Sequence, residues 1–285
     1  MTTLTGAGKI AGVVGWPVGH SLSPLMHGFW LDELGLDGAL VPLAVAREDF
    51  ARVIAGLQRA GLAGVNVTVP HKQAALAMAA VTDDAAGLAG AANLLIFRPD
   101  GVLEGRNTDW LGLRESLSEA GVPVANRVVT LLGAGGAARG ALLALAAGGA
   151  RRVHILNRRP AKAQALAAAL AKTLKLDLQA HAIADWPALA AGTDLLINAT
   201  AAGMKGQTSL SLELDVLKTG AWVMDMVYNP LETELLRKAQ AAGHPIVDGL
   251  SMLMHQAVPS FAAFFGVTPK VSGALRAALQ RALDG

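Results

Sequence analysis

Cysteine is absent from the 285-residue sequence, and aromatic side chains make up only 4% of it. The absence of cysteine excludes disulfide bonds and thiolate metal sites. Charged residues are also few, at 16%, and no run of like charges accompanies the net charge of +2, so nothing in the sequence indicates a nucleic-acid partner. The hydrophobic fraction of 53% instead predicts a folded protein with a large core.

A continuous hydrophobic segment long enough to span a membrane is also missing. The longest uncharged stretch, residues 10–31, contains two prolines, two histidines and four glycines, which would make a poor spanning helix. The first residues lack the charged segment, apolar core and cleavage site of a secretory signal. We therefore expect a cytoplasmic protein with no membrane partner, and the sequence leaves both a monomer and a homodimer open.

Strands alternate with helices in both halves of the chain, and the length favours two domains. In the second half we expect strands at residues 127–132, 152–156, 194–198 and 221–226, and helices that end at 147, begin at Pro160 and span 231–242. In the first half we expect strands at 10–15, 39–45, 64–69, 92–97 and 102–105, and helices at 24–34, 48–60 and 70–80. A helix at 110–120 with the loop 121–124 marks the domain junction, and two helices split near Pro269 form the tail. The fold class is α/β, with a parallel sheet in the second half.

A glycine turn in the second half indicates a dinucleotide site. Gly133, Gly135 and Ala138 follow a predicted strand directly and open a predicted helix. The first glycine permits a tight turn, the second lets the backbone approach a pyrophosphate, and the small third residue lets helix and strand pack closely. The helix N-terminus then faces the phosphates with free N–H groups. An ordinary glycine-rich strand-to-helix turn is the alternative.

The next predicted strand ends at Asn157, Arg158 and Arg159, without the acidic residue that holds the ribose hydroxyls of NAD. A guanidinium group can pair with a 2′-phosphate, which a carboxylate would repel. This favours NADP as the cofactor. The alternative is that both arginines are solvated residues before a helix.

Several short segments in the first half are polar at positions where the packing of a hydrophobic core gives no reason for polar residues. Ser21 and Ser23 stand at a loop–helix junction, although capping of the helix at 24–34 by Ser23 would explain that residue. Polar groups at 66 and 68 share one strand face. Lys72 begins a helix, where a cation opposes the helix dipole, and such conflicts tend to mark sites. Residues 107–109 also begin a helix. Their residue types alone favour a capping role slightly over a catalytic one.

Taken in order, these strings resemble the shikimate dehydrogenase family over nearly the whole chain. The matching strings are Gly15-Trp-Pro-Val-Gly-His-Ser-Leu-Ser-Pro24, Asn66-Val-Thr-Val-Pro-His-Lys72, Gly90-Ala-Ala-Asn93, Asn107-Thr-Asp109, Gly133-Ala-Gly-Gly-Ala-Ala-Arg-Gly140, Asn157-Arg158, Asn198-Ala-Thr200, Tyr228-Asn-Pro230 and Asp248-Gly-Leu250 with Gln256. No single string is specific, but their order along the chain is.

The resemblance implies an NADPH-dependent reduction of 3-dehydroshikimate to shikimate, in the biosynthesis of chorismate and aromatic amino acids. It implies a substrate-binding domain at 1–109, completed by C-terminal helices at 248–285, and a Rossmann NADP-binding domain at 110–247. Lys72 and Asp109 are the implied catalytic pair. The implied substrate-binding residues are Ser21, Ser23, Thr68, Asn93, Tyr228 and Gln256. The implied cofactor-binding residues are Gly133, Ala134, Gly135, Gly136, Ala137, Asn157, Arg158, Arg159, Thr200 and Gly249.

The residue types suit that chemistry. Hydride transfer to a ketone leaves an alkoxide, which needs a proton and a nearby positive charge. The ammonium of Lys72 offers both, and the carboxylate of Asp109 can orient it or relay the proton, as a coupled pair. The chemistry needs no metal and the sequence has no HExxH pattern, so we expect structural or indirect roles for the four histidines His20, His27, His71 and His255.

Several positions depart from the family's pattern. Leu94 stands in place of a usual Thr, Trp110 in place of a usual Gly, and Ser251 in place of a common Gly; Ala201-Ala202 replaces a hydroxyl-bearing pair, and Met254-His255 precedes Gln256. These departures keep two alternatives open. One is a quinate/shikimate dehydrogenase of broader substrate range. The other is an NADPH-binding paralogue without catalysis, against which the intact Lys72 and Asp109 argue.

Overall fold

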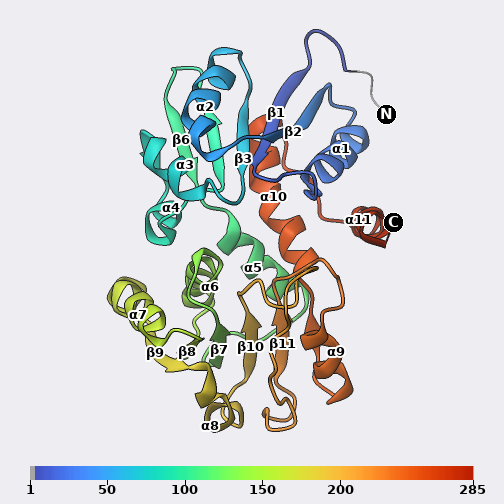
Figure 1. The fold of residues 1–285 in the computed structure, drawn as a ribbon. Coiled ribbons are helices and arrows are strands. Elements are labelled where there is room, and N and C mark those ends of the chain that lie inside the picture. Colours follow the sequence, from blue (N-terminus) through green and yellow to red (C-terminus); the bar gives the residue numbers. More distant parts are fainter. Residues whose placement is uncertain (1–3, 285) are drawn as a thin grey trace. The chain divides into compact units, whose positions relative to one another are not determined.

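The computed structural model describes residues 4–284, which form two compact units (Figure 1). Unit 1 consists of Met1–Thr108 and Gln256–Gly285, and unit 2 of Asp109–His255. The chain therefore passes from one unit to the other twice, between Thr108 and Asp109 and between His255 and Gln256. Among the described residues, no helix is both long and apolar enough to cross a membrane.

Unit 1 is built on a mixed six-stranded sheet with the strand order β2-β1-β3-β5-β6-β4. Its strands are β1 (Lys9–Gly15), β2 (Gly38–Ala44), β3 (Gly64–Val67), β4 (Val81–Thr82), β5 (Leu94–Phe97) and β6 (Leu103–Arg106). Strand β5 is antiparallel to both of its neighbours, whereas the other pairs are parallel. The start of β5 therefore lies at the same edge as the ends of β1, β3 and β6.

Helices cover both faces of this sheet. They are α1 (Ser23–Leu34), α2 (Phe50–Arg59) after a short 3₁₀ turn at Arg47–Asp49, α3 (Lys72–Met78), α4 (Asp84–Ala89), α10 (Gly249–Phe265) and α11 (Gly273–Asp284). Phe50, Ile54 and Ala75 pack one face against the strands. Trp30 of α1 and Phe261 of α10 meet edge to face at a ring distance of 5.4 Å, so segments far apart in the sequence close the other core.

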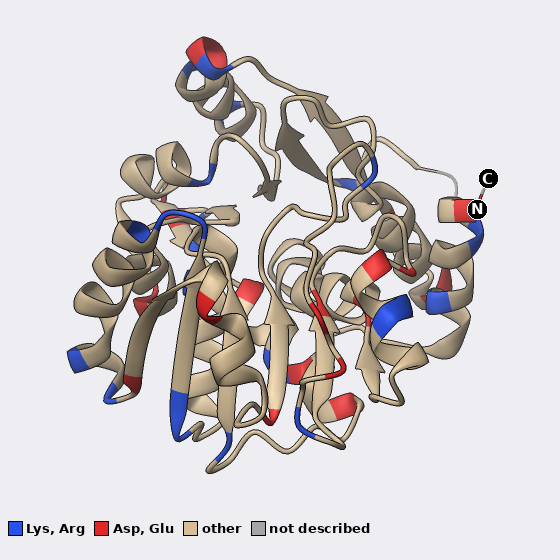
Figure 2. Ribbon diagram, turned by 60° about the horizontal axis from the view of Figure 1, so that its bottom comes forward, with Lys and Arg blue, Asp and Glu red and all other residues tan. Residues whose placement is uncertain are grey.

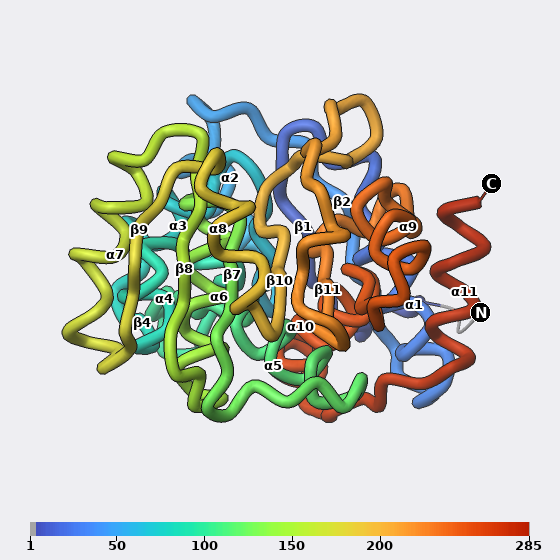
Figure 3. The backbone as a smooth tube through the Cα atoms, turned by 90° about the horizontal axis from the view of Figure 1, so that it is seen from below, coloured from blue at the N-terminus to red at the C-terminus, as the bar shows by residue number. Residues whose placement is uncertain are grey.

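Unit 2 has six parallel strands in the order β12-β11-β10-β7-β8-β9 (Figure 3). They are β7 (Val128–Leu132), β8 (Arg152–Asn157), β9 (Asp177–Ala182), β10 (Leu195–Asn198), β11 (Trp222–Asp225) and β12 (Ile246–Val247). The helices are α5 (Asp109–Glu119), α6 (Gly136–Ala147), α7 (Pro160–Leu174), α8 (Trp186–Ala190) after a 3₁₀ turn at Ile183–Asp185, and α9 (Glu234–Ala241). A core of Leu132, Leu196, Trp186 and Leu236 joins the sheet to α8 and α9. The predicted α/β class and parallel sheet are confirmed.

Local signals located the long elements well and their ends less well. The helix expected at 70–80 begins at Lys72 and ends at Met78, and β3 ends at Val67 instead of Val69. Helix α9 begins at Glu234 because the hydroxyl of Thr233 accepts a hydrogen bond from the Leu236 amide and caps the helix there. The sequence predicts a start at residue 231 instead.

One capping prediction was wrong. Helix α1 begins at Ser23 itself, and its N-cap residue, Leu22, makes no side-chain capping hydrogen bond. Instead, the Ser21 hydroxyl accepts a hydrogen bond from the Ser23 amide at 3.3 Å. Capping therefore does not explain the presence of Ser23.

Five short elements were not foreseen: β4, α4, β9, α8 and β12. Strand β9 lies at the edge of its sheet and reads Asp-Leu-Gln-Ala-His-Ala, too polar to produce a recognisable apolar run. Helix α8 has five residues, and β4 and β12 have two each. Elements this short form because of the structure packed around them.

Candidate active site

The predicted substrate-binding residues of unit 1 lie near one edge of its sheet, where Thr68 follows the end of β3 and Asn93 precedes the start of β5. Backbone hydrogen bonds hold them there. The Thr68 amide donates to the Val14 carbonyl at 2.9 Å, and the Ala92 amide donates to the Lys72 carbonyl at 2.9 Å. The Val67 amide donates to the Asn93 carbonyl at 2.8 Å. Thr68, Lys72 and Asn93 are therefore neighbours, although 25 positions separate the first from the last.

A side-chain network joins Asn93 to the C-terminal helix. The Asn93 side-chain amide donates to the Gln256 side-chain oxygen at 3.2 Å and to the Thr108 hydroxyl at 3.0 Å. The Thr108 hydroxyl also lies 2.8 Å from the Gln256 carbonyl, to which it can donate, and the Thr108 amide donates to the Asn93 side-chain oxygen at 2.8 Å. Thr108 was not assigned a role from the sequence. Its place between Asn107 and Asp109 was the available signal.

The loop that carries Ser21 and Ser23 is anchored at the same edge of the sheet. The Trp16 amide donates to the Val69 carbonyl at 3.1 Å, which ties the segment leading to Ser21 and Ser23 to the residue after Thr68. Ser23 is 7% exposed, and Ser21 is partly buried. The loop and the network above are thus both anchored at this edge.

Lys72 is the first residue of α3 and is partly buried. The preceding residue, His71, stacks on the Phe50 ring at 4.6 Å, and its Nε2 lies 2.8 Å from the Val45 carbonyl oxygen. His71 therefore holds the start of α3 through packing and a hydrogen bond. This is a structural role, as expected for the histidines.

His27 also has a structural setting. It is fully buried among Trp30, Phe261 and two further phenylalanine rings, and burial lowers its pKa to about 3. Its Nε2 faces the Asn66 side-chain amide at 3.5 Å. Within residues 4–284, no cluster of three or more His, Asp or Glu side chains has an arrangement that could hold a metal ion.

In unit 2 the predicted cofactor residues lie at the carboxyl edge of the parallel sheet. Gly133 follows β7 with a φ of +109°, and a Cβ there would lie 3.1 Å from the Ala199 carbonyl oxygen. Gly135 is the N-cap of α6, and a Cβ at Gly135 or Gly136 would meet no described atom within 4 Å. Gly133 therefore serves the chain's own packing. The open space at the other two glycines fits a pyrophosphate approaching the start of α6.

The remaining parts of the turn agree with this arrangement. Ala138 is fully buried, so the small third position serves helix–strand packing, whereas Ala134 is partly buried and Ala137 is exposed. The N-cap residue of α6 is Gly135, which has no side chain to cap the helix. The N-terminal amides of α6 are thus suited to an anion such as a phosphate.

The end of β8 presents two cations. Arg158 and Arg159 are both exposed, and the Asn157 side-chain amide donates to the Arg159 carbonyl at 2.9 Å. Asn157 thus shapes the loop that carries the arginines. Elsewhere, acidic and basic residues are interspersed along helices and strands (Figure 2).

A buried network supports the ends of β10 and β11. The Asp225 carboxylate accepts hydrogen bonds from the Asn198 side chain at 2.9 Å, the Thr233 hydroxyl at 2.7 Å and the Val227 amide at 3.0 Å. Burial raises the pKa of Asp225. The Thr200 hydroxyl donates to the Asn198 side-chain oxygen at 2.7 Å. Asp225 was missed from the sequence, where an acid within an apolar strand was the available signal.

Three further predicted residues, Tyr228, Gly249 and Asp109, lie in unit 2 beyond this network. Burial raises the pKa of Tyr228 above its ordinary value, and the protonated phenol can donate a hydrogen bond. A Cβ at Gly249 would lie 2.4 Å from the Met226 carbonyl oxygen, so close packing of α10 requires this glycine. Asp109 is the first residue of α5. The implied catalytic pair is therefore divided between the units, with Lys72 in unit 1 and Asp109 in unit 2.

The departures from the family pattern have separate settings. Leu94 is fully buried, so its side chain belongs to the core. The Arg114 guanidinium lies 5.1 Å from the centre of the Trp110 ring, which places a cation over the indole next to Asp109. The Glu119 carboxylate accepts hydrogen bonds from both Ser251 and His255.

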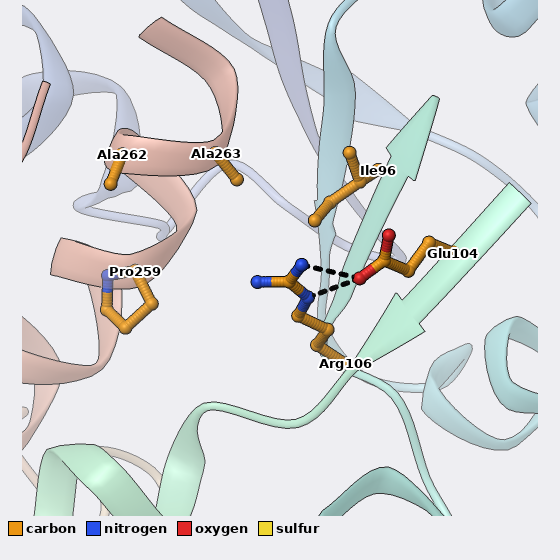
Figure 4. Close-up of a pocket in the computed structure, with 6 residues that line it drawn as sticks. All are labelled: Ile96, Glu104, Arg106, Pro259, Ala262 and Ala263. Atoms are coloured by element: carbon orange, nitrogen blue, oxygen red, sulfur yellow. Dashed lines mark hydrogen bonds and ion pairs between the residues drawn. The ribbon is translucent and has the colours of Figure 1, made fainter. Parts of the chain in front are cut away.

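A hollow of about 480 Å³ lies elsewhere in unit 1 (Figure 4). The Arg106 guanidinium binds the Glu104 carboxylate at one side of it, and α10 contributes Pro259 and two alanines. None of the predicted site residues is among those that line it. The hollow therefore does not include the predicted site residues, although Arg106 ends β6 and its carbonyl accepts a hydrogen bond from the Asn93 amide at 3.0 Å.

Two α/β units, one of them a parallel sheet with a glycine turn after its first strand, define a dinucleotide-binding protein of the Rossmann type with an additional α/β unit. Residues 13–95 match the family described as shikimate dehydrogenase substrate binding domain, and residues 116–210 match shikimate / quinate 5-dehydrogenase. The chain belongs to the shikimate dehydrogenase family.

Individual relatives agree with this assignment. The chain is 48% identical to the shikimate dehydrogenase (NADP(+)) of Paramagnetospirillum magneticum, an alignment that covers 96% of this chain and 99% of the relative. It resembles the Thermus thermophilus shikimate 5-dehydrogenase in complex with NADP(H) and shikimate, at 35% identity and a TM-score of 0.84, with 95% and 99% coverage. It also resembles the Corynebacterium glutamicum quinate dehydrogenase in complex with NAD, at 28% identity and a TM-score of 0.88, with 96% and 99% coverage.

Proposed function

We propose that the protein is an NADP-dependent shikimate dehydrogenase that reversibly reduces 3-dehydroshikimate to shikimate. The observation that carries the proposal is the hydrogen-bonded network of Asn93, Thr108 and Gln256 beside Lys72. Such a set of neutral polar groups, with Lys72 on a neighbouring backbone segment, suits a small polyhydroxylated acid. The family and the relative at 48% identity support this substrate and cofactor.

The cofactor is assigned to the carboxyl edge of unit 2. The amides at Gly135, Gly136 and Ala137 would hold the pyrophosphate, because the turn is open and the helix dipole favours an anion. Arg158 would bind the 2′-phosphate, assisted by the exposed Arg159. By the family resemblance, Ala134, Thr200 and Gly249 would also contact the cofactor. When bound, NADPH supplies the hydride.

The substrate is assigned to the polar edge of unit 1. Ser21 and Ser23 would bind the carboxylate, and this role would explain why the Ser23 hydroxyl does not cap its helix. Thr68, Asn93 and Gln256 would hold the ring hydroxyls, with the protonated Tyr228 phenol as a further donor. Because amides and hydroxyls both donate and accept, they can discriminate among hydroxyl positions.

Lys72 and Asp109 would form the acid–base pair. In the reductive direction the Lys72 ammonium would donate a proton to the oxygen that gains negative charge, and in the reverse direction its amine would accept one. Asp109 would orient the ammonium or relay a proton from solvent to the neutral amine. The two groups would titrate together, so a pH profile would report the pair.

Quinate is a second candidate substrate because one matching family description names both acids and a similar structure is a quinate dehydrogenase. Steady-state rates with shikimate and quinate, each with NADP⁺ and NAD⁺, separate the candidates. We expect shikimate with NADP⁺ to have the highest kcat/KM. Comparable turnover of quinate would favour the broader enzyme, and binding of NADPH without turnover of either acid would favour a non-catalytic paralogue.

A further inference from the structure

Helix α10 is one continuous helix, shown in orange-red in Figure 1, whose first residues belong to unit 2 and whose remaining residues belong to unit 1. Gln256 is the first of its residues assigned to unit 1. The orientation of the Gln256 side chain therefore depends on how the preceding turns of α10 are held, because a helix transmits a displacement along its axis.

Those turns pack closely at Gly249, and they are also bound to α5 by the carboxylate of Glu119, whose side chain is 53% exposed. The Glu119 carboxylate oxygen Oε2 accepts a hydrogen bond from the Ser251 hydroxyl at 2.6 Å and one from the His255 Nε2 at 3.1 Å. Ser251 is 6% exposed, so its hydroxyl has little access to water as an alternative partner. All three residues belong to unit 2. Ser251 and His255 are spaced four positions apart and so project from the same face of α10.

Ser251 and His255 have no part in the substrate and cofactor contacts proposed above. Both converge on a single oxygen of Glu119, and His255 directly precedes Gln256.

The other end of this connection is the network around Gln256. Its carbonyl oxygen lies 2.8 Å from the Thr108 hydroxyl, and its side-chain oxygen accepts from Asn93 at 3.2 Å. Thr108 immediately precedes α5, whose last residue is Glu119. Side-chain hydrogen bonds thus link α10 to both ends of the segment 108–119.

We infer that Glu119 is a positioning residue for substrate binding: it fixes the first turns of α10 through Ser251 and His255, and thereby the orientation of the Gln256 amide. The inference rests on the proposed function, because it assigns Gln256 to the substrate. Glu119 itself contacts neither substrate nor cofactor in this scheme. Its loss therefore affects the binding of shikimate more than the chemical step.

The test is the KM for shikimate and for NADP⁺ in Glu119→Ala and Glu119→Gln. Glu119→Ala removes both hydrogen bonds and should raise the KM for shikimate by about five- to tenfold, with a change in the KM for NADP⁺ below about twofold. Glu119→Gln retains an oxygen that accepts both hydrogen bonds and should stay within about twofold of the unmodified chain. Glu115→Ala, on the same helix and partly exposed, is the matched control and should behave as the unmodified chain.

A second pair of variants covers the case in which Glu119→Ala does not fold. His255→Ala removes one donor and should raise the KM for shikimate, whereas His255→Gln supplies an amide donor in place of Nε2 and should restore it. Thermal unfolding of each variant identifies any loss of folded protein.

The outcomes distinguish the inference from the function on which it rests. If the unmodified chain turns over shikimate but the alanine variants leave its KM unchanged, or raise both KM values equally, the inference is wrong and the function stands. If the unmodified chain does not turn over shikimate, the proposed function is wrong and the inference falls with it.

Discussion

Unit 2 and unit 1 present their polar groups at sheet edges in different ways. In unit 2 all strands are parallel, and the residues assigned to the pyrophosphate lie within the contiguous turn Gly133–Ala137. In unit 1 the sheet is mixed, and Asn93, Thr108 and Gln256 meet from three separate segments. A phosphate can be held by one turn and one helix end, whereas a ring with several hydroxyls needs donors from several directions.

The largest effect is expected from a substitution that removes the catalytic group assigned to unit 1. Lys72→Ala should lower kcat by about 10²- to 10⁴-fold, because it removes the proton donor for the reduced oxygen. Cofactor binding should be unchanged, since the NADP site is assigned to unit 2. Steady-state kinetics with fluorescence titration of NADPH checks both parts, and Lys172→Ala on the exposed surface of α7 is the control. An unchanged kcat would rule out the proposed mechanism, though not the function.

A smaller effect is expected from a substitution that tests the cofactor site assigned to unit 2. Arg158→Ala should weaken binding of NADPH by about 1.5–3 kcal/mol through loss of a charged hydrogen bond, and should weaken binding of NADH much less. Isothermal titration with each cofactor measures the difference. Equal losses for both cofactors would mean that Arg158 does not recognise the 2′-phosphate.

The stability of unit 1 at low pH should show how much this unit depends on packing between distant segments. Burial lowers the pKa of His27 from 6.5 to about 3, so below pH 6.5 the unfolded chain takes up a proton that the folded chain refuses. The stability present above pH 6.5 is therefore lost as the pH falls toward 3, by about 1.4 kcal/mol per pH unit, or about 2 kcal/mol at pH 5.

His27→Leu should remove that part of the pH dependence. Urea unfolding of both proteins at about pH 7.5 and pH 5 measures it, with His20→Leu as a control at an exposed position. If His27→Leu loses as much stability on acidification as the unmodified chain, protonation of His27 does not contribute.

The smallest effects separate folding from cofactor binding within one turn. Gly133→Ala should destabilise the protein by about 1–2 kcal/mol, because a side chain at a φ of +109° is strained and would crowd the Ala199 carbonyl. Gly135→Ala should change stability by no more than about 0.5 kcal/mol, since its Cβ meets no described atom within 4 Å, yet it should raise the KM for NADPH.

Thermal unfolding and NADPH kinetics of the two variants distinguish these effects. Equal destabilisation by both substitutions would contradict the division of roles between the two glycines. An unchanged KM for NADPH in Gly135→Ala would contradict the approach of the pyrophosphate to this turn.

The sequence alone determined the features that depend on neighbours along the chain. The strand before Gly133, the helix after it, the start of α7 at Pro160 and the placement of Lys72 at a helix start follow from local backbone preferences and apolar periodicity. The family could be predicted for the same reason, because its motifs are short strings in a set order. Their roles in binding and catalysis stay predictions.

Only the tertiary structure decided which distant groups meet. No residue near Thr108 in the sequence indicates that Thr108 contacts Gln256, 148 positions away. The sequence likewise does not indicate that Glu119 accepts hydrogen bonds from Ser251 and His255. The role of Ser21 in place of Ser23 at the start of α1 likewise depended on the path of the loop. These contacts are specified by packing of whole sheets and helices, and pairs so far apart leave no periodic signal in the chain.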